Sequence, residues 1–174
     1  MIRIINADVI EGLRSLPEKS VHCVVTSPPY WGLRDYGVEG QIGLEPTPEE
    51  YVEKLVTVFR EVRRVLRDDG TLWLNLGDCY ASTTKGTRGK SKVQNYNSGS
   101  FFNPRKFNHG LKQKDLIGLP WRVAFALQAD GWYLRSDIIW AKPNPMPESV
   151  TDRPTKSHEY IFLLTKRARY FYDA

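Results

Sequence analysis

The residues best suited to chemistry form one short turn, Ser27-Pro28-Pro29-Tyr30, which Trp31 follows directly. The apolar run before the turn predicts a buried strand. The turn then lies at the carboxyl end of a strand, where open α/β sheets bind their ligands. Prolines stiffen the backbone and lack N–H donors, which leaves nearby carbonyls as acceptors in fixed directions. Ser27 adds a hydroxyl acceptor. The ring of Tyr30 or Trp31 adds a flat face for stacking, which contributes about 1–3 kcal/mol per base.

Such a turn suits a reaction at the exocyclic amino group of a nucleobase. This group has two N–H donors and a lone pair that is delocalised into the ring. Two acceptors that grip the hydrogens would favour a pyramidal nitrogen, whose lone pair could attack an electrophilic methyl group in line. A base in a duplex must first be flipped out of the stack, which costs a few kcal/mol. The alternative is that the turn only ends a strand.

The elements that must position this turn alternate between strands and helices. Asp8, with Glu11 three residues later, is typical of a helix start, and so is the pair Thr47-Pro48. Apolar patterning predicts strands at residues 2–5, 21–26, 71–76, 132–140 and 158–165, and helices at 8–16, 48–67 and 120–130. This order predicts an α/β layer sandwich whose mainly parallel sheet ends in an antiparallel edge.

A long polar segment, residues 80–114, interrupts this pattern and carries only positive formal charge. It has eight Lys and Arg residues, no Asp or Glu, and interleaved aromatic residues. Cationic side chains neutralise phosphates and aromatic rings stack on bases. A structureless loop of this length is uncommon unless it has a function. We therefore expect a DNA-contacting loop, with these candidate contacts: Lys85, Arg88, Lys90, Lys92, Arg105 and Lys106.

Several blocks of the sequence, in one order, resemble the DNA amino-methyltransferases that modify cytosine N4 or adenine N6. The first block contains the Ser-Pro-Pro-Tyr turn, and the others contain the predicted strands that follow it. The blocks are NADVIEGLRSLPEKSVHCVVTSPPYW, GTLWLNLGD, KDLIGLPWRVAFALQADGWYLRSDIIWAKPN and DRPTKSHEYIFLLTK. The resemblance implies the Rossmann-like fold of the enzymes that use S-adenosylmethionine, with double-stranded DNA as substrate. It makes residues 1–174 the target-base portion of one catalytic domain.

The resemblance also assigns roles to individual residues. Ser27, Pro28, Pro29 and Tyr30 would hold the flipped base, and serine at the first position resembles the cytosine-N4 members more than the adenine-N6 members. Asp8 would accept a hydrogen bond from the cofactor's adenine, and Asp78 is a weaker candidate of the same kind. Each has a structural alternative, because Asp8 can be a helix cap and Asp78 a turn former. Two further residues resemble a block beside the base pocket and are candidate DNA contacts: Trp140 and Lys142.

One feature of these enzymes does not appear in the sequence. They hold the methionine end of the cofactor on a Gly-rich turn of the Phe-x-Gly-x-Gly type, and no such turn follows a predicted strand here. In permuted members this turn comes after the target-base block. We therefore expect a C-terminal segment or a partner chain to supply it, and a homodimer alone would not create it. A non-catalytic nucleic-acid-binding subunit is the competing interpretation.

Composition narrows the class of protein further. With 174 residues, 41% hydrophobic and 26% charged, the chain fits one soluble domain. A net charge of +5 suits an anionic partner. No long apolar run or secretory signal is apparent, which favours a cytoplasmic protein. Cys23 and Cys79 predict buried free thiols and no metal site, and neither is placed like the nucleophile that cytosine-C5 methylation needs.

Overall fold

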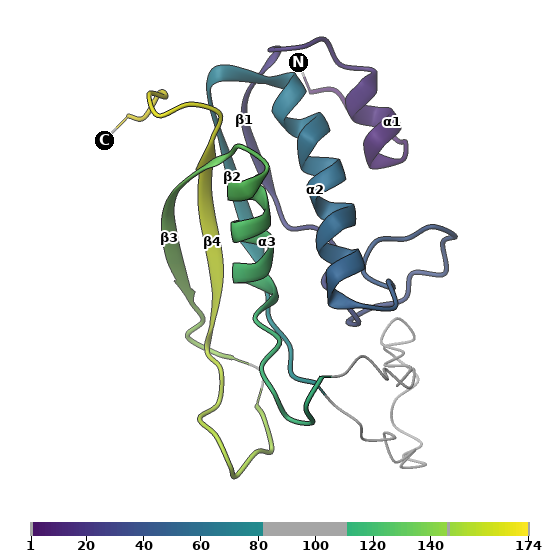
Figure 1. Cartoon of the computed structure of the whole chain (residues 1–174), viewed down its shortest axis with the longest axis vertical. Coiled ribbons are helices and arrows are strands. Elements are labelled where there is room, and N and C mark those ends of the chain that lie inside the picture. The colour runs from purple at the N-terminus through teal and green to yellow at the C-terminus, as the bar shows by residue number, and fades with distance from the viewer. Residues whose placement is uncertain (1, 82–110, 146, 174) are drawn as a thin grey trace.

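The computed structural model describes residues 2–81, 111–145 and 147–173. These ranges contain seven elements (Figure 1): α1 (Val9–Arg14), β1 (Val21–Thr26), α2 (Pro48–Val65), β2 (Leu66–Leu76), α3 (Leu119–Ala129), β3 (Tyr133–Ala141) and β4 (His158–Thr165). No helix in them is both long and apolar enough to cross a membrane. The helix starts predicted at Asp8 and Thr47 are confirmed, since both side chains accept hydrogen bonds from the first turn.

The four strands form one mixed sheet in the order β1-β2-β4-β3. β1 and β2 are parallel and are joined through α2, as parallel neighbours require a crossover. β4 runs antiparallel to both β2 and β3. The antiparallel edge is therefore confirmed, whereas the expectation of a mainly parallel sheet is wrong for the described strands.

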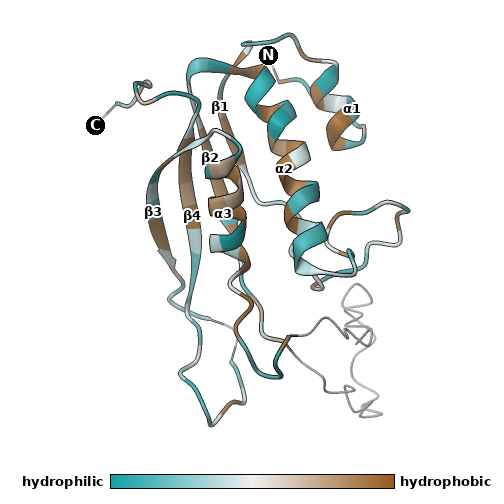
Figure 2. Cartoon of the chain, viewed as in Figure 1, coloured by the Kyte–Doolittle hydropathy of each residue, from teal (hydrophilic) through white to brown (hydrophobic). Residues whose placement is uncertain are grey.

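Two helices provide the apolar layer that covers the sheet. Figure 1 shows α2 and α3 side by side in front of the strands, with α1 beside α2. Figure 2 shows apolar residues along the strands and in bands on both helices. The largest fully buried side chains come from both layers: Tyr51, Leu55, Phe59, Leu72, Leu74, Leu127, Phe162 and Leu164. This core fixes the strand ends relative to the helices.

Two sequence-based expectations about boundaries are wrong. Residues 2–5 form no strand, and Ile2 and Ile4 are almost fully exposed. An isolated strand is unstable without a neighbour, and no described strand pairs with this segment. The strand predicted to begin at residue 71 begins at Leu66, because the Asp-Asp-Gly run forms an irregular part of β2 rather than a turn. A Cβ at Gly70 would lie 2.7 Å from the His22 carbonyl oxygen, so the close approach of β1 requires glycine.

Truncating the fully buried Leu55 of α2 to alanine should destabilise the fold. We expect Leu55→Ala to lower the free energy of unfolding by about 2–5 kcal/mol, through lost burial and the cavity left behind. Urea denaturation followed by tryptophan fluorescence measures this. Val38→Ala, at a position 65% exposed, is the control and should change the value by less than about 0.5 kcal/mol. Equal effects of the two substitutions would contradict the assigned core.

Candidate active site

The ends of three strands meet at one edge of the sheet. Ser27 follows the carboxyl end of β1, and Asn75 lies near the carboxyl end of the parallel strand β2. β4 is antiparallel to β2, so its first residues, with Glu159, lie at the same edge. Tyr30 joins them from the turn after β1. Polar side chains that are far apart in the sequence are thereby brought together.

Four oxygen–oxygen contacts connect these side chains. Ser27 Oγ lies 3.2 Å from Asn75 Oδ1 and 3.3 Å from the Tyr30 hydroxyl. The Tyr30 hydroxyl lies 2.8 Å from Asn75 Oδ1 and 3.1 Å from Glu159 Oε2. Ser27 and Tyr30 bring one hydroxyl proton each, whereas the amide oxygen and an ionised carboxylate bring none. The cluster thus has more acceptor capacity than donors, which suits a ligand that carries two N–H groups.

The charge on Glu159 is set by its neighbours. Burial acts against ionisation, but hydrogen bonds from Lys142, Tyr30 and Asn75 together keep the pKa of Glu159 below its usual value. Lys142 forms an ion pair with this carboxylate, and its ammonium lies 5.5 Å from the ring centroid of the half-exposed Trp140. Burial also raises the pKa of Tyr30. At neutral pH Glu159 is therefore an anion and Tyr30 a neutral donor.

The two proline carbonyls of the turn differ in availability. The hydroxyl of Tyr51, from the buried face of α2, donates to the Pro29 carbonyl at 3.0 Å. Among the described residues, none donates to the Pro28 carbonyl. Ser27 itself is exposed and the prolines are half-buried, so the turn is accessible. Of the acceptors predicted in the turn, the Ser27 hydroxyl and the Pro28 carbonyl are therefore the two that remain available to a ligand.

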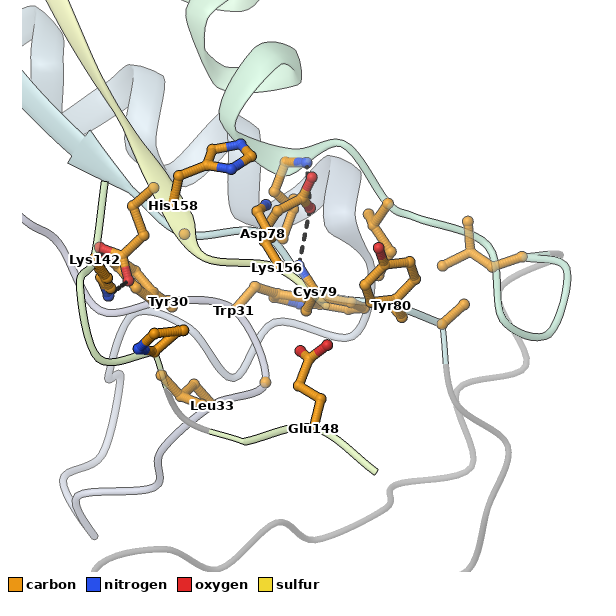
Figure 3. Close-up of a pocket in the computed structure, with 18 of the residues that line it drawn as sticks. Tyr30, Trp31, Leu33, Asp78, Cys79, Tyr80, Lys142, Glu148, Lys156 and His158 are labelled. Carbon is orange, nitrogen blue, oxygen red and sulfur yellow. Dashed lines mark hydrogen bonds and ion pairs between the residues drawn. The ribbon is translucent and has the colours of Figure 1, made fainter. Parts of the chain in front are cut away.

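A cavity of about 420 Å³ lies beside the cluster (Figure 3). Tyr30 and Lys142 lie at one end of it and Tyr80 at the other. Other lining residues include Trp31, Asp78, Cys79, Glu148, Lys156, His158 and Glu159. Ser27, Pro28 and Pro29 do not line the cavity, so Tyr30 is the one residue of the turn that reaches it. A Cβ at Gly77 would lie 2.5 Å from the Tyr30 ring, so only glycine at this position leaves room for the ring.

Trp31, which was predicted with Tyr30 as a ring for stacking on DNA, is largely buried. It is only 6% exposed, and its indole N–H donates to the Glu45 carbonyl at 2.9 Å. The residue belongs to the core and forms a wall of the cavity. A sequence pattern could not show this, because Glu45 comes fourteen residues later in an irregular loop.

The two predicted cofactor carboxylates have structural roles and lie on different parts of the fold. Asp78 Oδ1 accepts hydrogen bonds from the backbone N–H groups of Cys79, Gly118 and Leu119, and so caps the amino end of α3. It also lines the cavity. Asp8 accepts from the Ile10 N–H as the cap of α1 and is not part of the lining. Only Asp78 is therefore placed beside the candidate site.

The six basic contacts predicted in the long loop lie outside the described residues: Lys85, Arg88, Lys90, Lys92, Arg105 and Lys106. The free thiol expected to be buried at Cys23 is exposed, because Cys23 pairs with Thr71 on the face of the sheet opposite the buried Leu72 and Leu74. The described residues contain no group of three that could hold a metal ion.

Sequence reasoning missed three residues that shape the site. Asn75 and Gly77 flank the end of β2, and Tyr51 supports the turn from α2. Asn75 could have been singled out from the sequence, since it is a polar residue in the largely apolar run TLWLNL. Tyr51 could not, because it occupies an ordinary position on the apolar stripe of a helix.

Curated relatives share much of this sequence. The type II methyltransferase M.Cfr9I of Citrobacter freundii is 59% identical over 166 residues, which are 95% of this chain and 55% of that protein. The type II methyltransferase M.SmaI of Serratia marcescens is 58% identical over 171 residues, which are 98% of this chain and 58% of that protein. The chain thus spans about half the length of the curated relatives it matches.

Solved structures share the fold. TTHA0409 of Thermus thermophilus, solved in complex with S-adenosyl-L-methionine, matches with a TM-score of 0.61 and 27% identity, over 96% of this chain and 56% of that one. PvuII DNA methyltransferase (cytosine-N4-specific) matches with a TM-score of 0.63, over 94% of this chain and 49% of that one. At 19% identity the second likeness shows the fold alone.

The chain has part of the α/β fold of the methyltransferases, with a mixed four-stranded sheet. A family match extends over residues 21–174, which include the Ser-Pro-Pro-Tyr turn and all four strands. This chain therefore belongs to the N6/N4 methyltransferase family of DNA methylases.

Proposed function

We propose that the whole protein carrying this chain is a type II DNA methyltransferase that transfers a methyl group from S-adenosylmethionine to the N4 amino group of cytosine. The observation that supports it best is the acceptor-rich cluster around Ser27, at an accessible strand end. The family of DNA methylases supports DNA as the substrate, and the structure of TTHA0409 in complex with S-adenosyl-L-methionine supports that donor. Serine at the first position of the turn favours cytosine.

In this proposal the target cytosine is flipped out of the duplex so that its amino group reaches the turn. The Ser27 hydroxyl and the Pro28 carbonyl accept one N–H hydrogen each. This grip directs the nitrogen lone pair away from the turn and makes it a better nucleophile. The Tyr30 ring, held by Gly77 and by its own hydroxyl contacts, borders the space that the base would enter.

The cavity fits part of the methyl donor. When bound, S-adenosylmethionine supplies an electrophilic methyl group: the carbon–sulfur bond breaks with its electron pair left on sulfur as the new nitrogen–carbon bond forms. The methylated amino group would then lose one of its two protons to solvent, which gives the neutral product. The Tyr30 ring suits a neighbouring cation, and Asp78 lies in the cavity wall. Asp8 is not part of this wall, and the expected Gly-rich turn is not in the sequence. This chain would therefore supply only one side of the cofactor site.

Mass spectrometry of nucleosides from DNA treated with the whole protein and S-adenosylmethionine tests the proposal. We expect N4-methylcytosine. Adenine also presents an exocyclic amino group, so N6-methyladenine would contradict the assignment to cytosine while supporting amino methylation at the same site. Absence of any methylated nucleoside, or formation of 5-methylcytosine, would contradict the proposal.

Removing the Ser27 hydroxyl should slow methyl transfer with little effect on DNA affinity. We expect Ser27→Ala to lower the single-turnover rate by about a hundredfold, the effect of losing one well-placed polar contact to the reacting group. The dissociation constant for DNA should stay within about twofold. Ser20→Ala is the matched control, because Ser20 lies at the opposite end of β1 and donates only to the Pro17 carbonyl. A comparable loss of DNA affinity in Ser27→Ala would indicate a structural role instead.

The two thiols should differ in reactivity, which bears on whether either could act as the nucleophile that cytosine-C5 methylation needs. Burial, and then the nearby Asp78 carboxylate, raise the pKa of Cys79 to about 12. Since only the thiolate reacts, very little of Cys79 should be reactive at pH 8. We expect iodoacetamide at pH 8 to modify the exposed Cys23 well before Cys79, as measured by peptide mass spectrometry. Faster modification of Cys79 would show a thiol activated as a nucleophile.

A further inference from the structure

We propose that Asn75 and Glu159 are positioning residues that direct the protons of Ser27 and Tyr30, and so leave the lone pairs of Ser27 Oγ free for the target amino group. This inference rests on the proposed function, since it concerns how Ser27 becomes an acceptor. Neither residue needs to touch the base. Each acts through a hydroxyl group that it contacts directly.

A serine hydroxyl is a useful acceptor only when its own proton is directed elsewhere. Ser27 has one proton and two lone pairs, and a proton that pointed at the base would oppose the N–H groups. Asn75 Oδ1, 3.2 Å away, can only accept. A hydrogen bond between the two therefore requires Ser27 to donate, which turns its lone pairs away from Asn75.

The orientation of the Asn75 amide is fixed by the neighbouring strand. Its Nδ2 donates to the backbone carbonyl of Tyr160 in β4 at 3.2 Å. A flipped amide would place two carbonyl oxygens against each other and lose this bond. Oδ1 must therefore face the hydroxyl groups of Ser27 and Tyr30.

Tyr30 competes with Ser27 for the same amide oxygen. Its hydroxyl oxygen lies 2.8 Å from Asn75 Oδ1, closer than Ser27 Oγ, and 3.1 Å from Glu159 Oε2. One tyrosine proton cannot serve both acceptors fully. An ionised carboxylate is the stronger acceptor, and the ion pair with Lys142 keeps Glu159 ionised. Tyr30 therefore donates its proton to Glu159, and Asn75 Oδ1 remains available to accept the proton of Ser27.

Two substitutions remove this arrangement in different ways. Asn75→Ala removes the nearer acceptor and leaves Ser27 only the Tyr30 hydroxyl oxygen at 3.3 Å, so that the Ser27 proton can turn toward the base more readily. Glu159→Gln leaves a neutral side chain that can donate to Tyr30, so the tyrosine proton returns to Asn75 and displaces that of Ser27. Thr71→Val is the matched control. Thr71 lies four residues before Asn75 on the same face of β2, and its hydroxyl contacts Cys23 and Trp73, not Ser27.

The test compares single-turnover methylation rates of the whole protein with and without Ser27. We expect Asn75→Ala and Glu159→Gln each to slow methylation by about tenfold, the effect of one lost hydrogen bond. For Asn75→Ala the dissociation constants for DNA and S-adenosylmethionine should stay within about twofold, and Thr71→Val should keep the full rate. In the Ser27→Ala background neither substitution should slow the reaction further, because both act through that hydroxyl.

Multiplicative losses in the Ser27→Ala background would overturn the inference, and so would full rates in both single variants. If Asn75→Ala fails to fold, the partly exposed Glu159 decides the question, since Glu159→Gln keeps the shape of the side chain. Failure of the unsubstituted protein to methylate DNA would overturn the proposed function itself. Multiplicative losses in a protein that does methylate would overturn only the roles of Asn75 and Glu159.

Discussion

The register between three strands is the constraint on which the rest of the site depends. Parallel pairing places Thr26 opposite Leu74, and antiparallel pairing places Leu76 opposite Tyr160. Side chains alternate between the two faces of a strand, so a shift of β2 by one residue would turn Asn75 to the other face. The buried Leu72, Leu74 and Leu76 prevent this shift, because it would expose them to water. Apolar burial thus sets the position of a polar cluster.

The helices cover the sheet and also position parts of the site. α2 directs the Tyr51 hydroxyl to the Pro29 carbonyl, which anchors one half of the turn and leaves the other half open. α3 begins where Asp78 caps its first N–H groups, so the end of β2 is tied to the second helix. The hydrogen-bond acceptors that remain available to a ligand are therefore those that accept no hydrogen bond from the helices.

Local patterns in the sequence predicted much of this arrangement, while contacts between distant segments were beyond them. The helix caps at Asp8 and Thr47 depend on neighbouring residues and were predicted. The burial of Trp31 was missed, because it depends on packing between separate segments. The strand predicted at residues 2–5 failed for the opposite reason, since a local apolar run forms a strand only beside a partner. Asn75 was overlooked because the pattern of its strand is read from apolar residues.

In the proposed mechanism, the turn after β1 receives an extruded nucleobase by its amino group. A crystal structure of the whole protein with a DNA duplex containing its recognition sequence and with S-adenosylhomocysteine, the demethylated cofactor, tests this most directly. We expect a flipped cytosine whose N4 atom lies within hydrogen-bonding distance of Ser27 Oγ and of the Pro28 carbonyl oxygen. A flipped base held elsewhere, with Ser27 and Pro28 in contact only with solvent, would contradict it.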